Sequence, residues 1–285
     1  MNNVAMDGFL ASIMAVESID GAAAVLHGPG GCRNTTARLS SRQMLRDFTI
    51  REGPFYFDTP RVPCTYVDDE DYVNGADYKV TELMDTIEGE DLCVVIPSPG
   101  TSLIGDDLHG AIYRSMFKGD GVALEYCHMS EPMYVGYDCA IGEIVRNVCK
   151  RGETVPGTVV LTGIPILLQG WETTEAEFRS YLEAMGLKVV ASVGAGCTYG
   201  ELKEAANAEF IVSVLPEWCS DTMESYGRFG VRSLVPKVPV GFGATESWIR
   251  QVAEATGRDP ERALSLLRPM EERSRRLLKG GMHLG

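Results

Sequence analysis

The chain has 285 residues, of which 45% are hydrophobic and 23% charged, so it can bury a sizeable core in one large domain or two of ordinary size. Its formal net charge of −14 argues against nucleic acid and anionic membranes as partners, because both are bound by clusters of Lys and Arg. No apolar run approaches the roughly 18 residues of a membrane span, and the first residues lack the basic segment and long apolar run of a secretory signal. These features predict a cytoplasmic protein.

Apolar runs alternate with helical patterns through the first half of the chain. Residues 22–26 and 92–96 are short apolar runs bounded by polar residues, which is typical of buried parallel strands. A third strand is predicted at 122–126, and helices are predicted at 6–18, 35–48, 78–87, 104–117 and 138–150.

A polar segment with a glycine and a proline, residues 151–157, predicts a boundary between domains 1–153 and 154–285. The second domain repeats the alternation, with strands at 159–161, 187–192 and 210–215, an extended segment at 234–240, and helices at 174–185, 199–206, 220–227, 245–256 and 260–278. Strands that alternate with such helices form βαβ units with parallel sheets. We therefore predict an α/β protein with two mainly parallel sheets and a long C-terminal helix.

The first apolar run ends in a glycine-rich loop, Gly28-Pro29-Gly30-Gly31-Cys32. Glycine adopts positive φ and lets the backbone approach a bulky ligand, and proline fixes φ. A strand that ends in such a loop can present its thiol at the top of an α/β sheet. A tight strand-to-helix turn with a buried free cysteine explains the same residues.

The eight cysteines include no C-x-x-C pair, which excludes zinc-ribbon and thioredoxin-like sites, and a cytoplasmic protein rarely holds a disulfide framework. Loops 27–32, 63–75 and 97–107 follow predicted strands, so Cys32 and Cys64 are expected to meet at one edge of the sheet. Two thiolates indicate a soft-metal site such as an iron–sulfur cluster. Since a [4Fe–4S] cluster takes four ligands, a carboxylate or another cysteine joins them, or two chains contribute two each.

The other chemically interesting residues have structural explanations. Cys93 lies in a predicted strand and Cys139 and Cys149 on a helix, so we expect all three in the core, whereas Cys127, Cys197 and Cys219 lie in loops near strand ends and stay unassigned. We expect His27 to fix its loop by a hydrogen bond. Asp106 and Asp107 form a capped helix start, because acidic residues suit the first turn. The acidic segment 68–71 is either solvated or a docking contact for a basic partner.

The order of these motifs resembles the nitrogenase component 1 superfamily, which includes the subunits of the nitrogenase molybdenum–iron protein, protochlorophyllide and chlorophyllide reductases, and the Ni-sirohydrochlorin reductive cyclase. The matching segments are 27–32 (HGPGGC), Cys64-Thr65-Tyr66 with Asp71, 73–75 (VNG), 103–108 (LIGDDL), 131–132 and 136–138 (EP and GYD), 182–187 (LEAMGL), and 239–241 with 244–245 (PVG and AT). The ordered set runs from about residue 5 to the C-terminus.

The resemblance implies a stack of Rossmann-like domains whose subunits pair as dimers or heterotetramers. It also implies an iron–sulfur cluster at the subunit interface, to which a separate ATP-hydrolysing iron protein delivers electrons. By this match, Cys32 and Cys64 occupy the positions of the first two cluster cysteines, with Gly30 and Gly31 beside the cofactor. Pro99 occupies the position of the third cysteine and cannot ligate, which favours a [4Fe–4S] cluster shared between two chains, in a homodimer or with a related subunit.

The family usually continues past a helix such as 260–278 into a third Rossmann-like domain, which this chain is expected to lack. The resemblance implies a nitrogenase-like oxidoreductase component that passes electrons from its reductase partner to an unsaturated or tetrapyrrole-like substrate. The alternatives are a non-catalytic scaffold or carrier for metallocluster assembly and a paralogue without a cluster.

Overall fold

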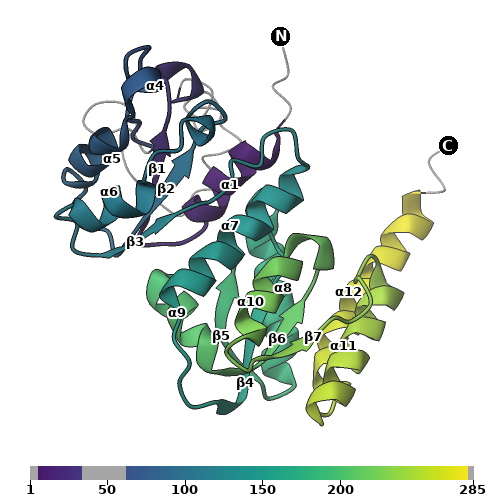
Figure 1. The fold of residues 1–285 in the computed structure, drawn as a ribbon. Helices are drawn as coiled ribbons and strands as arrows, with labels where there is room; N and C mark the ends of the chain where they lie inside the picture. Colours follow the sequence, from purple (N-terminus) through teal and green to yellow (C-terminus); the bar gives the residue numbers. More distant parts are fainter. Residues whose placement is uncertain (1–5, 34–61, 282–285) are drawn as a thin grey trace.

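The computed structural model describes residues 6–33 and 62–281, with side chains up to residue 278. The helix predicted at 35–48 lies outside these ranges. Two sheets stand next to each other, with helix α7 (Met133–Val148) running between them (Figure 1). Within the described ranges, no helix is both long and apolar enough to cross a membrane.

The first sheet contains three parallel strands in the order β1-β2-β3. Its strands are β1 (Ala22–His27), β2 (Leu92–Pro97) and β3 (Asp120–Ala123), and its helices are α1 (Gly8–Glu17), α4 (Asp71–Asn74), α5 (Asp77–Met84) and α6 (Leu108–Arg114), with a short 3-10 helix, η1 (Thr101–Leu103). All residues of β1 and β2 are buried. Helices on both faces of these strands explain why their sequences are continuous apolar runs.

The second sheet contains four parallel strands in the order β5-β4-β6-β7. Its strands are β4 (Val155–Thr162), β5 (Lys188–Val193), β6 (Ala208–Ser213) and β7 (Arg232–Leu234). Its helices are α8 (Trp171–Ala184), α9 (Tyr199–Glu204), α10 (Ser220–Gly227), α11 (Phe242–Thr256) and α12 (Glu261–Gly281), with 3-10 helices η2 (Ala205–Asn207) and η3 (Pro216–Trp218). The predicted fold class, α/β with two mainly parallel sheets and a long C-terminal helix, is confirmed. The division between residues 153 and 154 stays a prediction.

Several predicted boundaries are wrong. Helix α7 begins at Met133, five residues before the predicted start at Asp138, directly after Pro132. Proline is well suited to a helix start, because its missing N–H has no helical partner there. Strand β3 ends at Ala123 rather than at Tyr126, where Tyr126 is exposed. An exposed side chain gains nothing from staying in the sheet, so the chain leaves it early.

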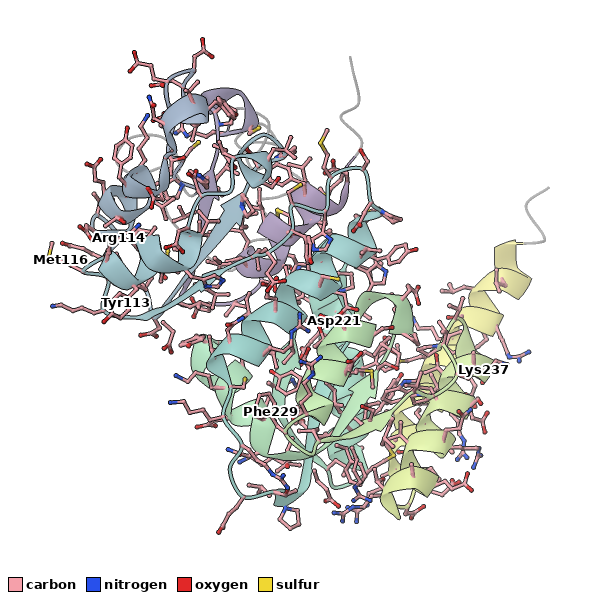
Figure 2. The ribbon with its side chains drawn as sticks, viewed as in Figure 1. Tyr113, Arg114, Met116, Asp221, Phe229 and Lys237 are labelled. Carbon is pink, nitrogen blue, oxygen red and sulfur yellow. The ribbon has the colours of Figure 1, made fainter. Side chains whose placement is uncertain are left out.

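Helix α7 contacts both halves of the molecule. On one side it packs against α1, where Ser12 Oγ lies 3.0 Å from the carbonyl oxygen of Gly136 in α7. On the other side it packs against α10, where Arg146 donates to Asp221 over 2.8 Å (Figure 2). One continuous cluster of buried side chains runs from α1 and β1 through α7 to β4, β6 and α11.

A second, smaller cluster covers the outer face of the first sheet. Val25, Cys93 and Val95 of the strands pack there against Val80 and Met84 of α5 and Ala111 of α6. Tyr113 of α6 and Met116, which follows the end of that helix, protrude at the edge of the molecule (Figure 2). The carboxyl ends of β1 and β2 are thereby fixed on both faces, and the loops that follow them start from a rigid base.

Candidate functional site

The two predicted ligand cysteines lie on neighbouring segments at the carboxyl end of β1. Residues 63–67 run beside the end of this strand, since Leu26 N donates to Pro63 O at 2.8 Å and Thr65 N donates to Leu26 O at 3.1 Å. Cys64 thereby pairs with Leu26 in a parallel bridge. Cys32 lies in the helical turn of residues 30–33 that directly follows the adjacent loop, where its N–H donates to Pro29 O at 3.0 Å. The structure brings the two loops together as predicted, and their role as metal ligands stays a prediction.

The two thiols differ in burial. Cys64 is buried and its Sγ donates to Gly28 O over 3.1 Å, whereas Cys32 is half-buried. Burial raises the pKa of both thiols, and Cys32 raises that of Cys64 further. Without a metal both cysteines therefore carry their protons at neutral pH, and a metal would have to displace them.

The glycines and the proline of the predicted site lie around these thiols. A Cβ on Gly30 would come within 3.2 Å of the Tyr66 ring, whereas a Cβ on Gly31 would meet no atom of the described residues within 4 Å. Pro99 follows β2 and offers only its carbonyl, which accepts from Ser102. Next to it, a Cβ on Gly100 would come within 2.6 Å of the Tyr72 hydroxyl. Burial raises the pKa of Tyr72, and the nearby Cys32 adds to the effect.

His27 fixes its loop, as the sequence predicts, and it does so with both ring nitrogens. Nδ1 lies 3.1 Å from Thr65 Oγ1, and Nε2 lies 2.8 Å from Asp106 Oδ2. The ring is completely buried. Burial lowers the pKa of His27, and the Asp106 carboxylate opposes that effect. Asp107, the next residue, caps α6 by accepting from Gly110 N at 2.8 Å, so the predicted cap is confirmed, although the helix starts at Leu108 rather than at residue 104.

The expectation that the acidic segment 68–71 is wholly solvated or a docking contact is wrong for Asp71. This side chain is buried and accepts from Lys79, from Asp68 N and from the Tyr78 hydroxyl. Burial opposes its ionisation, but the Lys79 ammonium and the other donors hold the pKa of Asp71 below its usual value. Asp71 is a structural anchor for α5, since it binds the second and third residues of that helix.

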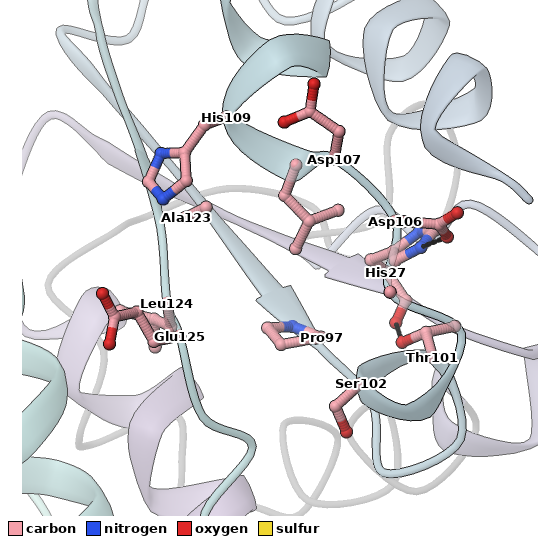
Figure 3. A pocket seen from close by; sticks show the side chains of 12 residues that line it. His27, Pro97, Thr101, Ser102, Asp106, Asp107, His109, Ala123, Leu124 and Glu125 are labelled. Carbon is pink, nitrogen blue, oxygen red and sulfur yellow. Dashed lines mark hydrogen bonds and ion pairs between the residues drawn. The ribbon is translucent and has the colours of Figure 1, made fainter.

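A cavity of about 340 Å³ opens at the carboxyl ends of the three strands (Figure 3). It is lined by His27, Pro97, Thr101, Ser102, Gly105, Asp106, Asp107, Leu108, His109, Ala123, Leu124 and Glu125. In open parallel sheets this edge is where ligands bind. The His27–Asp106 pair lies in the wall of the cavity, and residues 63–67 lie at the opposite edge of the His27 ring.

Glu143 of α7 is a buried carboxyl group behind this cavity. Its Oε1 accepts from the N–H of Glu125 at 3.1 Å, and burial raises the pKa of Glu143 to about 7. The folded state therefore binds a proton that the unfolded chain has released, so stability falls as pH rises from about 4.5 to about 7.

We expect Glu143→Gln to stabilise the protein at pH 8 by about 2 kcal/mol, after allowing for solvent screening of the carboxylate, and to change little at pH 5. The neutral amide removes the ionisation that burial disfavours and keeps an acceptor for Glu125 N. Urea unfolding at both pH values measures the difference. Glu125→Gln, which changes the exposed neighbour, is the control, and equal stabilisation at both pH values would contradict the assignment.

The other six cysteines divide by burial. Cys93 and Cys149 are buried, as predicted, and so are Cys197 and Cys219, whereas Cys127 and Cys139 are half-buried. The core prediction is therefore wrong for Cys139, whose helix position is only partly covered. Across residues 6–33 and 62–278, no group of three or more His, Cys, Asp or Glu side chains has a metal-binding arrangement. Cys32 and Cys64 thus supply at most half of a four-ligand set from the described part of one chain.

The family model described as nitrogenase component 1 type oxidoreductase matches residues 8–281. The chain belongs to this family. The match covers both sheets and every described helix, so the resemblance that the motifs predict is confirmed along the whole described chain.

Among curated relatives of this nitrogenase component 1 type chain are subunits of light-independent protochlorophyllide reductase. One such subunit, from Nostoc punctiforme, is 24% identical over 201 residues, which are 66% of this chain and 37% of that protein. Another, from Rhodopseudomonas palustris, is 21% identical over 243 residues, 79% of this chain and 53% of that protein. A third, from Cereibacter sphaeroides, is 28% identical over 171 residues, which are 58% of this chain and 32% of that protein. The chain thus spans between about a third and a half of these relatives.

Solved structures of nitrogenase Cp1 have the same fold. The structure at pH 6.5 superimposes with a TM-score of 0.71 at 15% identity, covering 91% of this chain and 60% of the other. The structure at pH 5 superimposes with a TM-score of 0.70 at 17% identity, covering 93% of this chain and 54% of the other. At this identity the likeness shows the fold.

Two contacts of the site were not predicted from the sequence: the link between His27 and Asp106, and the pairing of Asp71 with Lys79. The motif predicts a capped helix start at Asp106 and Asp107, and only Asp107 performs that role. Nothing in the sequence indicates which of these two consecutive aspartates caps the helix. The buried Asp71 has no periodic signal either, because Gly75 and Ala76 separate its helix, α4, from the helix α5 that carries Lys79.

Proposed function

We propose that this chain is a nitrogenase-like oxidoreductase component in which Cys32 and Cys64 hold one side of an iron–sulfur cluster. The observation that carries the proposal is that Cys64 pairs with the end of β1 and donates to Gly28 of the loop that leads to Cys32, in a chain whose family is oxidoreductases. They come from segments more than 30 residues apart, and each lies on a loop anchored to a buried strand.

The residues present fit a cluster shared between two chains. Among the described residues, none would lie within 4 Å of a Cβ on Gly31, next to Cys32, and thiolate sulfur is the ligand that iron–sulfur clusters take. Pro99 cannot ligate, so one chain supplies two thiolates, and a second copy or a related subunit would supply the other two. When bound, the cluster would accept and donate single electrons. The chain's own part is to orient the thiols, bury them and exclude water.

In this proposal the electrons come from a separate ATP-dependent iron-protein reductase, and the acceptor is a bound unsaturated molecule. The curated relatives, which are light-independent protochlorophyllide reductase subunits, support a tetrapyrrole-like acceptor. A carrier of metalloclusters for another protein would use the same two cysteines without turnover.

Anaerobic reconstitution of the full chain with iron and sulfide tests the cysteine assignment. We expect about half a [4Fe–4S] cluster per chain, a cluster EPR signal after reduction, and loss of both in Cys32→Ala combined with Cys64→Ala. Cys139→Ala, which removes a half-buried thiol from α7, is the matched control and should retain its iron.

Equal iron content in the native chain and the double variant would overturn the proposal. If iron is bound through these cysteines, turnover with a reductase and ATP separates the electron-transfer component from the carrier, since only the former oxidises the reductase in the presence of its acceptor.

A further inference from the structure

We propose that His27 is a positioning residue that sets the relative placement of the Cys32 and Cys64 loops. The inference rests on the proposed function for its meaning, because it assigns His27 to the support of the cluster ligands. Its evidence is a network of hydrogen bonds that is connected through the buried ring of His27.

The directions of these hydrogen bonds follow from their partners. The N–H of Gly28 donates to Thr65 Oγ1 at 3.0 Å, so the hydroxyl proton of Thr65 is free to point at His27 Nδ1. His27 then carries its proton on Nε2 and donates it to Asp106 Oδ2. The N–H of Ala76 donates to the other oxygen, Asp106 Oδ1, at 3.0 Å. Every donor meets an acceptor when the imidazole is neutral and Asp106 is ionised, in agreement with the burial of the ring.

This chain of bonds joins four separate segments of the backbone. It begins in the glycine-rich loop at Gly28, crosses to the Cys64 segment at Thr65, and returns to the end of β1 at His27. From there it passes to the loop before α6 at Asp106 and ends just before α5 at Ala76. Figure 3 shows the His27 ring lying against Asp106, with Thr101 below it. Thr101 Oγ1 donates to the carbonyl of His27 at 2.7 Å, which fixes the residue's backbone as well.

The hydrogen bonds of Gly28 connect this network to Cys64 and to the loop that leads to Cys32. Its N–H is held by Thr65, and its carbonyl accepts from Cys64 Sγ at 3.1 Å and from Val67 N at 3.0 Å. A Cβ on Gly28 would lie 2.6 Å from Ser98 Cβ, so the loop is pressed against the end of β2. The loop that carries Cys32 therefore has little freedom to move relative to Cys64 while the ring of His27 stays in place.

Replacing either His27 or Asp106 should loosen the placement of the Cys32 and Cys64 loops in the same way. In His27→Gln the amide cannot reach both Thr65 and Asp106. In Asp106→Asn the –NH₂ group must face one of two donors, His27 Nε2 or Ala76 N, so one of these bonds is lost. We expect each variant to retain iron about 10-fold less well against a chelator than the native chain. The iron that remains should show a changed EPR spectrum and a shifted midpoint potential.

Asp107→Asn is the matched control. It makes the same chemical change one residue later, on an exposed side chain whose capping role asparagine performs equally well. Its iron retention, EPR spectrum and potential should equal those of the native chain. A variant pair at Thr65 adds a rescue: Thr65→Val breaks the bond to His27, and Thr65→Ser restores the hydroxyl and the native behaviour.

Alkylation of the metal-free chain tests the positioning without relying on the cluster. We expect Cys64 to be modified faster in His27→Gln and Asp106→Asn, while the buried Cys93 and Cys149 keep their native rates. A general loss of stability would instead expose all three thiols together. Should His27→Gln fail to fold, the Thr65 pair provides the same comparison.

The outcomes separate this inference from the proposed function. If the native chain binds no iron through Cys32 and Cys64, the proposed function fails, and the alkylation rates still decide whether His27 restrains Cys64. If the native chain binds its cluster and both variants match it in iron retention, EPR spectrum and potential, the positioning role is overturned. Unchanged alkylation of Cys64 in the variants overturns it as well.

Discussion

Replacing Asp138 by Ala is expected to destabilise the protein by about 4 kcal/mol, because three donors, two of them buried, would lose their acceptor at once. Asp138 is buried in α7, and its carboxylate accepts from the N–H of Asp221 at 2.7 Å, the N–H of Thr222 at 2.9 Å and the hydroxyl of Thr222 at 2.7 Å. These are groups of the first turn of α10. Burial raises the pKa of Asp138, and the same hydrogen bonds limit the rise.

Urea unfolding of Asp138→Ala and Asp138→Asn measures this contribution. The asparagine oxygen still accepts from α10, so we expect it to lose only about 1 to 2 kcal/mol. Asp221→Asn is the control, since it changes a half-exposed neighbour that pairs with Arg146. A loss of less than 1 kcal/mol in Asp138→Ala would show that water replaces the lost carboxylate and that this contact does not hold the two helices together.

Replacing Gly136 by Ala is expected to destabilise the protein by about 3 kcal/mol, the upper range for overpacking, despite the better helix propensity of alanine. A Cβ at this position would lie 2.0 Å from the carbonyl oxygen of Gly8 in α1 and 2.6 Å from its Cα. These are backbone atoms, so no side-chain rotation relieves the clash, and α1 has to move away from α7.

The matched control is Gly243→Ala in α11, where a new Cβ would meet nothing within 4 Å. That variant should be as stable as the native chain or more so, because alanine favours the helix. Thermal and urea unfolding of both variants gives the comparison. Equal stability of Gly136→Ala and the native chain would mean that the close approach of α1 and α7 is not required.

The arrangement of the elements could be predicted from sequence because each buried strand of the first sheet is a continuous apolar run. Residues 22–26 and 92–96 lie inside β1 and β2 as predicted. The ends of the elements depend on contacts made by single residues. Pro132 starts α7 early, and the exposed Tyr126 lies beyond the end of β3, and neither effect has a periodic signal.

The candidate site could be predicted only as far as its loops. Cys32 and Cys64 follow from the glycine-rich turn and from the rule that parallel strands present their carboxyl ends together. The support of those loops could not be predicted, because His27 and Asp106 are 79 residues apart and their contact exists only after three strands have assembled. The wrong expectation for Asp71 has the same origin: an acidic run appears solvated until the lysine that neutralises one of its members is placed beside it.

The single buried cluster that passes through α1, α7 and both sheets has a thermodynamic consequence. Apolar surface shared by two sheets is exposed when either of them comes apart, so the free energy of one sheet includes contacts made by the other. Separation of either sheet therefore also removes apolar contacts that stabilise the other. The cysteine loops start from the end of β1, so their base is supported by packing that extends well beyond the smaller sheet.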